Sequence, residues 1–123
     1  MRATILATVF ALSAVVVLAQ AMPASVRVTN GILTDAKSMT LYTFDNDKEA
    51  NKSTCIATCL NNWPVLKADA SDKDMGDWKV ITRDDGAKQL AYKGKPLYYF
   101  STDKAPGDKN GDGRGMVWHI AKP

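Results

Sequence analysis

The feature that most constrains the fold of this chain is an internal duplication. Residues 41–47 read Leu-Tyr-Thr-Phe-Asp-Asn-Asp, and residues 97–103 read Leu-Tyr-Tyr-Phe-Ser-Thr-Asp. Both segments follow the pattern Leu-Tyr-x-Phe-x-x-Asp and lie 56 positions apart. A pattern that recurs at a fixed offset with matching context indicates a repeated structural unit. A chance similarity between two β-strands is the alternative.

The context of the two copies also matches. Each copy is preceded by two short runs typical of strands, separated by turn residues, and each is followed by a tryptophan, Trp63 or Trp118. The turns contain Asn-Gly at 30–31 and Asp-Gly at 85–86, which tolerate positive φ and favour tight hairpins. We expect strands at 26–29, 32–34, 41–44, 78–82, 89–92, 97–100 and 116–120.

These patterns predict a mainly β fold. We expect two pseudo-symmetric meander repeats of three to four strands, at about 26–66 and 78–123, packed into one small domain around a pseudo-twofold axis. Residues 53–60 start with a serine suited to cap a helix and predict one short helix that carries Cys55 and Cys59. The second repeat has several glycines instead, which favour an open loop.

The two cysteines leave alternatives open. In an oxidising compartment a single pair defaults to a disulfide. On a regular helix, however, side chains four residues apart have Cβ atoms about 5–6 Å apart, whereas a disulfide prefers about 3.8 Å. A bridge between Cys55 and Cys59 would therefore need to distort the turn, and a redox-active or metal-binding thiol pair is the alternative.

The start of the chain predicts export. Arg2 precedes an apolar run at 3–18, and Ala-Gln-Ala at 19–21 fits a signal-peptidase site. The run is shorter than the about 20 residues that span a membrane, although an uncleaved anchor is the alternative. We expect a signal peptide at 1–21 and a single secreted domain at 22–123. The domain would be periplasmic or secreted, with no membrane span after cleavage.

The paired motifs resemble the secreted-repeat lipoprotein family named for its Tyr-x4-Asp motif. The motif residues are Tyr42, Phe44, Asp47, Tyr98, Phe100 and Asp103. The segments at 55–64, 106–108 and 117–123 add to the resemblance. It implies an exported protein, often lipidated, with no assigned activity. This chain lacks a cysteine after the apolar run, so lipid attachment is not expected.

The motif residues have two interpretations. In the structural one, Tyr42 and Phe44 share a strand face, as do Tyr98 and Phe100, and these pairs clamp the core. A buried tyrosine hydroxyl then needs a partner, which an aspartate just past the strand would supply. In the functional one, Tyr42, Asp47, Tyr98 and Asp103 line a binding site shared between the halves.

Two metal sites are weaker candidates. Asp108, Asn110 and Asp112 match the first, third and fifth positions of a calcium loop, but His119 stands where the twelfth position needs glutamate. His119 and Met116, with other methionines or the cysteines, would suit copper.

The sequence contains no recognisable pair of nucleophile and base, so we do not predict an enzyme. We also expect no cofactor. The formal net charge of +3, with lysines scattered among aspartates, does not suggest a nucleic-acid partner. We therefore expect an exported, non-catalytic binding or envelope-associated module whose partner is an unknown envelope protein or small ligand. A periplasmic metal-handling protein is the alternative.

Overall fold

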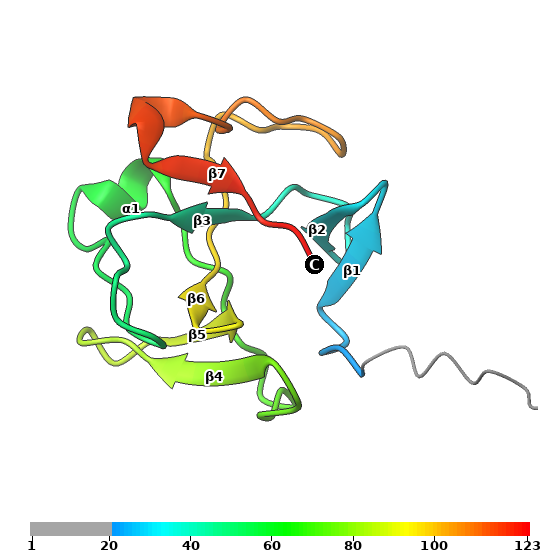
Figure 1. Ribbon diagram of the computed structural model, residues 1–123, viewed down its shortest axis with the longest axis vertical. Coiled ribbons are helices and arrows are strands. Elements are labelled where there is room, and N and C mark those ends of the chain that lie inside the picture. Colours follow the sequence, from blue (N-terminus) through cyan, green and yellow to red (C-terminus); the bar gives the residue numbers. More distant parts are fainter. Residues whose placement is uncertain (1–20) are drawn as a thin grey trace, which may run out of the picture.

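The computed structural model describes residues 21–123 and arranges them as short strands around a few turns and loops (Figure 1). The predicted signal peptide lies outside the described residues except for Ala21. The elements are β1 (Val26–Thr29), β2 (Ile32–Asp35), β3 (Tyr42–Phe44), α1 (Cys59–Asn62), β4 (Trp78–Thr82), β5 (Lys88–Tyr92), β6 (Lys95–Pro96), the 3-10 turn η1 (Arg114–Met116) and β7 (Trp118–Ile120).

Tight turns set the register of the hairpins. Asn30 and Gly31, with φ of 50° and 81°, join β1 to β2, and Lys93 and Gly94, with φ of 49° and 81°, join β5 to β6. Positive φ at both central residues is the conformation of the turn type that matches the twist of a two-residue hairpin. The predicted Asn-Gly turn is confirmed, and β4, β5 and β6 form a three-stranded meander in the second half, as expected. Its third strand is Lys95–Pro96 rather than 97–100, where Tyr98 forms isolated bridges instead.

The two halves meet at a pseudo-twofold axis that passes between the motif tyrosines. The Tyr42 N–H donates to the Tyr98 carbonyl at 2.8 Å, and the Tyr98 N–H donates to the Tyr42 carbonyl at 3.0 Å. Because each residue gives and accepts the same bond, the two Leu-Tyr-x-Phe strands lie antiparallel across the axis.

The segments that follow the tryptophans are exchanged between the halves. β7 from the second repeat pairs with β3 from the first, and residues 64–66 of the first repeat bond to residues 97–99 of the second. Figure 1 shows β7 lying along β3, far from the meander of its own repeat. Each half of the molecule therefore contains strands of one repeat completed by the last segment of the other.

Backbone hydrogen bonds fix which residues are equivalent. In each half, three residues bond one another in a closed triangle: one from the second strand, one from the third strand, and one from the exchanged segment. The two triangles equate Leu33 with Leu90, Leu41 with Leu97, and Ala121 with Leu66.

Two elements begin later than the sequence predicts. The helix starts at Cys59, so it carries only one of the two cysteines. Ala57 has a φ of 53°, which no residue of a right-handed helix adopts, and this interrupts the predicted helix at 53–60. The last strand starts at Trp118, because Met116 has a φ of 59° and belongs to the preceding turn.

The core has two parts. An aliphatic cluster lies between the β1–β2 hairpin and the β4–β6 sheet, and an aromatic cluster lies at the axis beside the disulfide. The buried aliphatic cluster includes Leu33, Leu41, Leu90 and Leu97, all of them less than 2% exposed. The motif therefore contributes a leucine to one cluster and aromatic rings to the other.

Candidate ligand-binding site

The two copies of the motif bond to each other reciprocally. The Tyr42 hydroxyl donates to Asp103 Oδ2 at 2.6 Å, and the Tyr98 hydroxyl donates to Asp47 Oδ2 at 2.7 Å. Each tyrosine thus bonds to the aspartate of the other copy. Both tyrosines are fully buried. Burial, together with the neighbouring aspartate, raises the pKa of both hydroxyls well above the usual value, which keeps them protonated as donors.

Each motif aspartate also orders a loop of its own repeat. Asp47 Oδ1 accepts bonds from the Thr54 backbone N–H and hydroxyl at 2.7 and 2.6 Å. Asp103 Oδ1 accepts bonds from the Asn110 backbone N–H and side-chain amide, both at 3.0 Å. In both copies the bonded residue lies seven positions after the aspartate. One carboxylate therefore holds both the partner repeat and the following loop.

Four stacked rings complete the joint between the repeats. Trp63 and Trp118 stack across the axis with ring centroids 3.7 Å apart. Phe44 stacks on the outer face of this pair against Trp118 at 4.1 Å, and Phe100 stacks against Trp63 at 4.4 Å. Each phenylalanine again meets the tryptophan of the other copy. The geometry supports the structural interpretation of the motif, and its use as a shared binding site stays a prediction.

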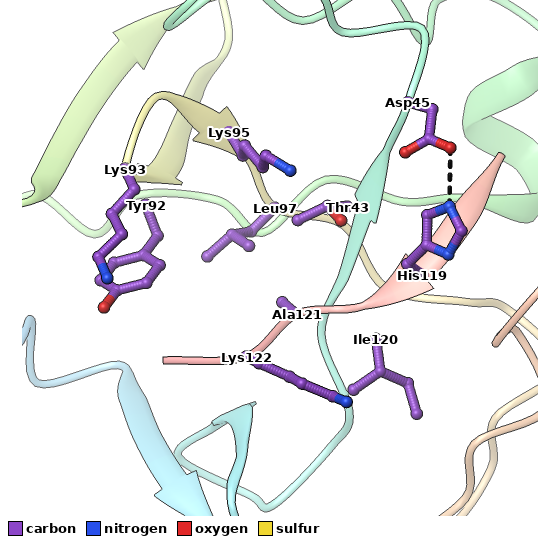
Figure 2. Close-up of a pocket in the computed structure, with 10 residues that line it drawn as sticks. All are labelled: Thr43, Asp45, Tyr92, Lys93, Lys95, Leu97, His119, Ile120, Ala121 and Lys122. Atoms are coloured by element: carbon purple, nitrogen blue, oxygen red, sulfur yellow. Dashed lines mark hydrogen bonds and ion pairs between the residues drawn. The ribbon is translucent and has the colours of Figure 1, made fainter.

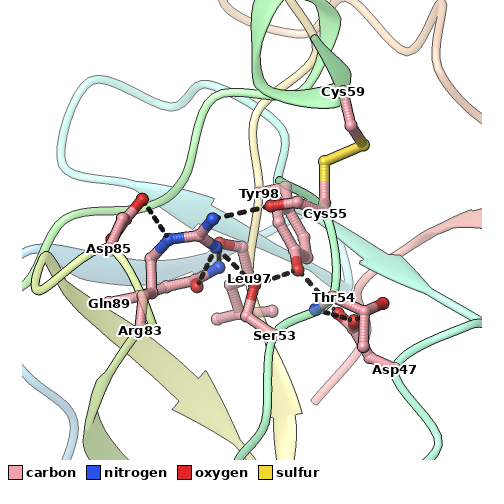
Figure 3. Close-up of a disulfide and its surroundings, with 10 residues drawn as sticks. All are labelled: Asp47, Ser53, Thr54, Cys55, Cys59, Arg83, Asp85, Gln89, Leu97 and Tyr98. Carbon is pink, nitrogen blue, oxygen red and sulfur yellow. Dashed lines mark hydrogen bonds and ion pairs between the residues drawn. A yellow bond between two sulfur atoms is a disulfide. The ribbon is translucent and has the colours of Figure 1, made fainter. Parts of the chain in front are cut away.

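The predicted disulfide is present. Cys55 and Cys59 are bridged, with Cα atoms 5.4 Å apart, and residues 21–123 contain no free cysteine (Figure 3). The concern about helical spacing does not apply, because Cys55 precedes the helix and the chain turns through Ala57 in a left-handed conformation. The bridge thus closes a short loop before α1.

A buried arginine, which sequence patterns do not predict, anchors this loop. Arg83 is 4% exposed, and its guanidinium donates to the Cys55 carbonyl at 2.6 Å, to Gln89 Oε1 at 3.1 Å and to the Ser53 hydroxyl. Its fourth bond, to Asp85 Oδ2 at 3.2 Å, supplies an opposite charge (Figure 3). The arginine therefore ties the disulfide loop of the first repeat to the β4–β5 hairpin of the second.

A pocket of about 330 Å³ opens on the side of β3 and β7, facing the β5–β6 turn (Figure 2). Its floor is apolar, since Leu97 is fully buried and Ala121 is 3% exposed. Its lining residues are Thr43, Asp45, Tyr92, Lys93, Lys95, Leu97, His119, Ile120, Ala121 and Lys122. The pocket therefore combines an apolar floor with a polar rim.

The rim is positively charged. Lys93, Lys95 and Lys122 all line the pocket, and within residues 21–123 none of them forms an ion pair. The single carboxylate of the lining, Asp45, bonds through Oδ2 to His119 Nε2 at 2.7 Å. With three lysines and one engaged carboxylate in its lining, the pocket has a local field that attracts anions.

Comparison with known proteins assigns the chain to a family. A family model described as a secreted repeat of unknown function matches residues 24–67 and again residues 79–122. The chain belongs to this family of secreted repeats. No curated protein and no solved structure matches it.

The secreted-repeat assignment confirms the resemblance drawn from the sequence and the presence of two repeats. It also supports a secreted protein, which agrees with the export predicted from the N-terminal residues. Among the helices of residues 21–123, none has the length and apolar character needed to cross a membrane.

Most of the candidate metal ligands bond to separate partners. Asp108 accepts two backbone N–H bonds, which lower the pKa of its carboxyl, and Asn110 bonds to the motif aspartate. Asp112 accepts a backbone N–H at 3.2 Å, Met116 is 85% exposed, and His119 bonds to a carboxylate on the rim. Within residues 21–123, no group of three His, Cys, Asp or Glu side chains is placed to hold a metal ion. The metal-handling alternative stays a prediction.

The pocket is the feature that sequence reasoning missed. Lys93 lies in the β5–β6 turn, Lys95 begins β6 and Lys122 follows β7, so lysines near the ends of two strands are the one signal available. Their convergence depends on the exchange of β7 into the other half, which a single sequence does not reveal.

Proposed function

We propose that this protein is an exported, non-catalytic binding module that holds a small organic anion in the pocket beside β3 and β7. The observation that carries the proposal is that Lys93, Lys95 and Lys122 all line one pocket that has an apolar floor. The family description and the N-terminal sequence support a periplasmic or secreted location for this module.

The two parts of the pocket favour a ligand with two parts. An apolar body placed on Leu97 and Ala121 would gain about 25 cal/mol for each Å² removed from water. An anionic group at the rim would meet lysine ammonium groups on flexible stems, each contributing about 0.2–1 kcal/mol at an exposed site. An inorganic ion would use only the rim, and a neutral apolar molecule only the floor.

The chemistry of the lining supports binding without catalysis. A hydrolytic site needs a nucleophile bonded to a base. His119 is the only basic imidazole here, and its bonded partner is Asp45 rather than a hydroxyl or thiol. Thr43 lies opposite His119 in the β3–β7 ladder, yet in the described part of the chain no hydrogen bond joins their side chains.

The test is a titration of the folded 15N-labelled protein with phenylacetate and, separately, hexanoate, followed by amide chemical shifts. We expect at least one of these anions to shift the resonances of Thr43, Leu97 and Ala121 in a saturable manner. Replacing the three rim lysines by glutamine should weaken that binding by about tenfold, as the loss of three partly exposed charge contacts predicts.

A matched control separates this site from general charge attraction. The triple variant with glutamine at Lys37, Lys73 and Lys104, which are all exposed and outside the pocket, removes the same charge. We expect it to bind like the unmodified protein. The proposal is wrong if neither anion shifts the pocket resonances, or if the two triple variants weaken binding equally.

A further inference from the structure

The internal repeat supplies a counterpart of the pocket in the other half of the molecule. The aligned motifs equate Thr43 with Tyr99, and the backbone triangles equate Ala121 with Leu66. The strand registers equate Tyr92, opposite Trp78, with Asp35, opposite Val26. These three residues of the pocket lining thus have identified equivalents on the other side of the axis.

In that counterpart, a tyrosine ring crosses the space. The Tyr99 hydroxyl donates to Asp35 Oδ2 at 2.8 Å, and its ring packs against the aliphatic core cluster. Tyr99 and Asp35 are the equivalents of Thr43 and Tyr92, which both line the pocket. The ring of Tyr99 therefore spans the same two positions that form opposite walls of the pocket.

Smaller side chains open the pocket in its own half. A threonine replaces Tyr99, which removes a whole phenol ring, and an alanine replaces Leu66 on the floor. The backbone around Ala121 has the same hydrogen bonds as the backbone around Leu66. The space between Thr43 and Tyr92 therefore reflects the absence of one phenol ring and one isopropyl group.

The polar end of the pocket differs in charge from its counterpart in the other half of the molecule. In the counterpart, the Asp35 carboxylate accepts a hydrogen bond from a phenol. At the equivalent position the pocket has Tyr92, and the neighbouring Lys93 and Lys95 also line it. Lysine ammonium groups only donate hydrogen bonds and carry positive charge, so they favour a ligand whose polar end accepts hydrogen bonds and is negatively charged.

We propose that the ligand is an anion carried on a single aromatic ring, such as an aryl carboxylate, and that its ring takes the place that the Tyr99 ring takes in the other half. This rests on the proposed function and names its ligand class. Thr43 and Ala121 determine the specificity for a ring, and the rim lysines bind the charged group.

The test compares three probes of similar size by the same amide titration. Phenylacetate has the ring and the charge, cyclohexylacetate has the charge on a ring that is not planar, and 2-phenylethanol has the aromatic ring without charge. We expect phenylacetate to bind about fivefold more tightly than cyclohexylacetate, as favourable aromatic contacts predict. 2-Phenylethanol should bind most weakly.

A variant that restores the internal ring tests the position directly. Thr43→Tyr should fold, as judged by its melting temperature, and should weaken phenylacetate binding by at least about tenfold, because the new ring occupies the ligand's place. Thr43→Ser keeps the space and should bind normally. If Thr43→Tyr does not fold, Ala121→Leu, which introduces the residue of the counterpart, gives the same readout.

The outcomes separate the two proposals. If cyclohexylacetate or hexanoate binds as tightly as phenylacetate, or if folded Thr43→Tyr binds phenylacetate normally, the aromatic ligand class is wrong and the organic-anion site stands. If no anion shifts the pocket resonances, the proposed function itself fails.

Discussion

Replacing Tyr42 by phenylalanine should lower the free energy of unfolding by about 3 kcal/mol. The hydroxyl donates to Asp103 at 2.6 Å and accepts the Gly111 N–H at 3.1 Å. Tyr42 has no exposed surface and Asp103 is only 8% exposed, so water replaces neither bond easily. A hydrogen bond to a carboxylate contributes about 1.5–3 kcal/mol, and a buried N–H left without an acceptor costs about 1 kcal/mol more.

The assay is urea denaturation followed by tryptophan fluorescence, with two comparison variants. Tyr98→Phe should cost a similar amount, about 2–3 kcal/mol, because its hydroxyl bonds both to Asp47 and to the hydroxyl of buried Ser53. Tyr92→Phe should change stability by less than about 0.5 kcal/mol, since its hydroxyl bonds to none of the other residues that line the pocket (Figure 2). A cost below about 0.5 kcal/mol for Tyr42→Phe would refute the reciprocal joint.

Three further predictions concern the joint and the disulfide loop. Gly111→Ala should destabilise by about 1–3 kcal/mol in urea, because an added Cβ would lie 2.8 Å from ring atoms of Tyr42; unchanged stability would contradict the packing. Replacing both cysteines by serine should cost about 2 kcal/mol, the chain-entropy contribution of so short a loop. Stability should fall as the pH rises above about 10, by up to about 1.4 kcal/mol per pH unit for each tyrosine whose pKa is raised in the folded state. Tyr99→Phe should reduce the dependence of stability on pH by the contribution of one tyrosine.

The repeat, the hairpin turns and the mainly β fold could be predicted because each depends on local chemistry. Asn30 and Gly31 accept positive φ, and they form the turn wherever two strands flank them. The disulfide followed from the compartment and the cysteine count. A bond between each tyrosine and an aspartate could be predicted as well, because a buried hydroxyl needs an acceptor and the motif supplies one in each copy.

The exchange between halves could not be predicted in the same way. The Tyr42 hydroxyl bonds to Asp103, which lies 61 positions away. A bond to Asp47, the aspartate of its own copy, would be chemically equivalent. Only the packing of the whole domain selects the partner. The start of the helix was misjudged because Ala57 adopts a left-handed conformation, so the Cys59 N–H bonds to the Ile56 carbonyl instead of the Cys55 carbonyl. The pocket depends on the same exchange, since β7 brings His119 and Ala121 to the first half.

The most direct test of the central claim is a measurement of nuclear Overhauser effects between phenylacetate and the protein. The account predicts contacts from the ring protons of the ligand to the methyl groups of Ala121 and Leu97, which form the pocket floor. Contacts confined to the separate hollow lined by Trp63 and Arg114 would contradict it.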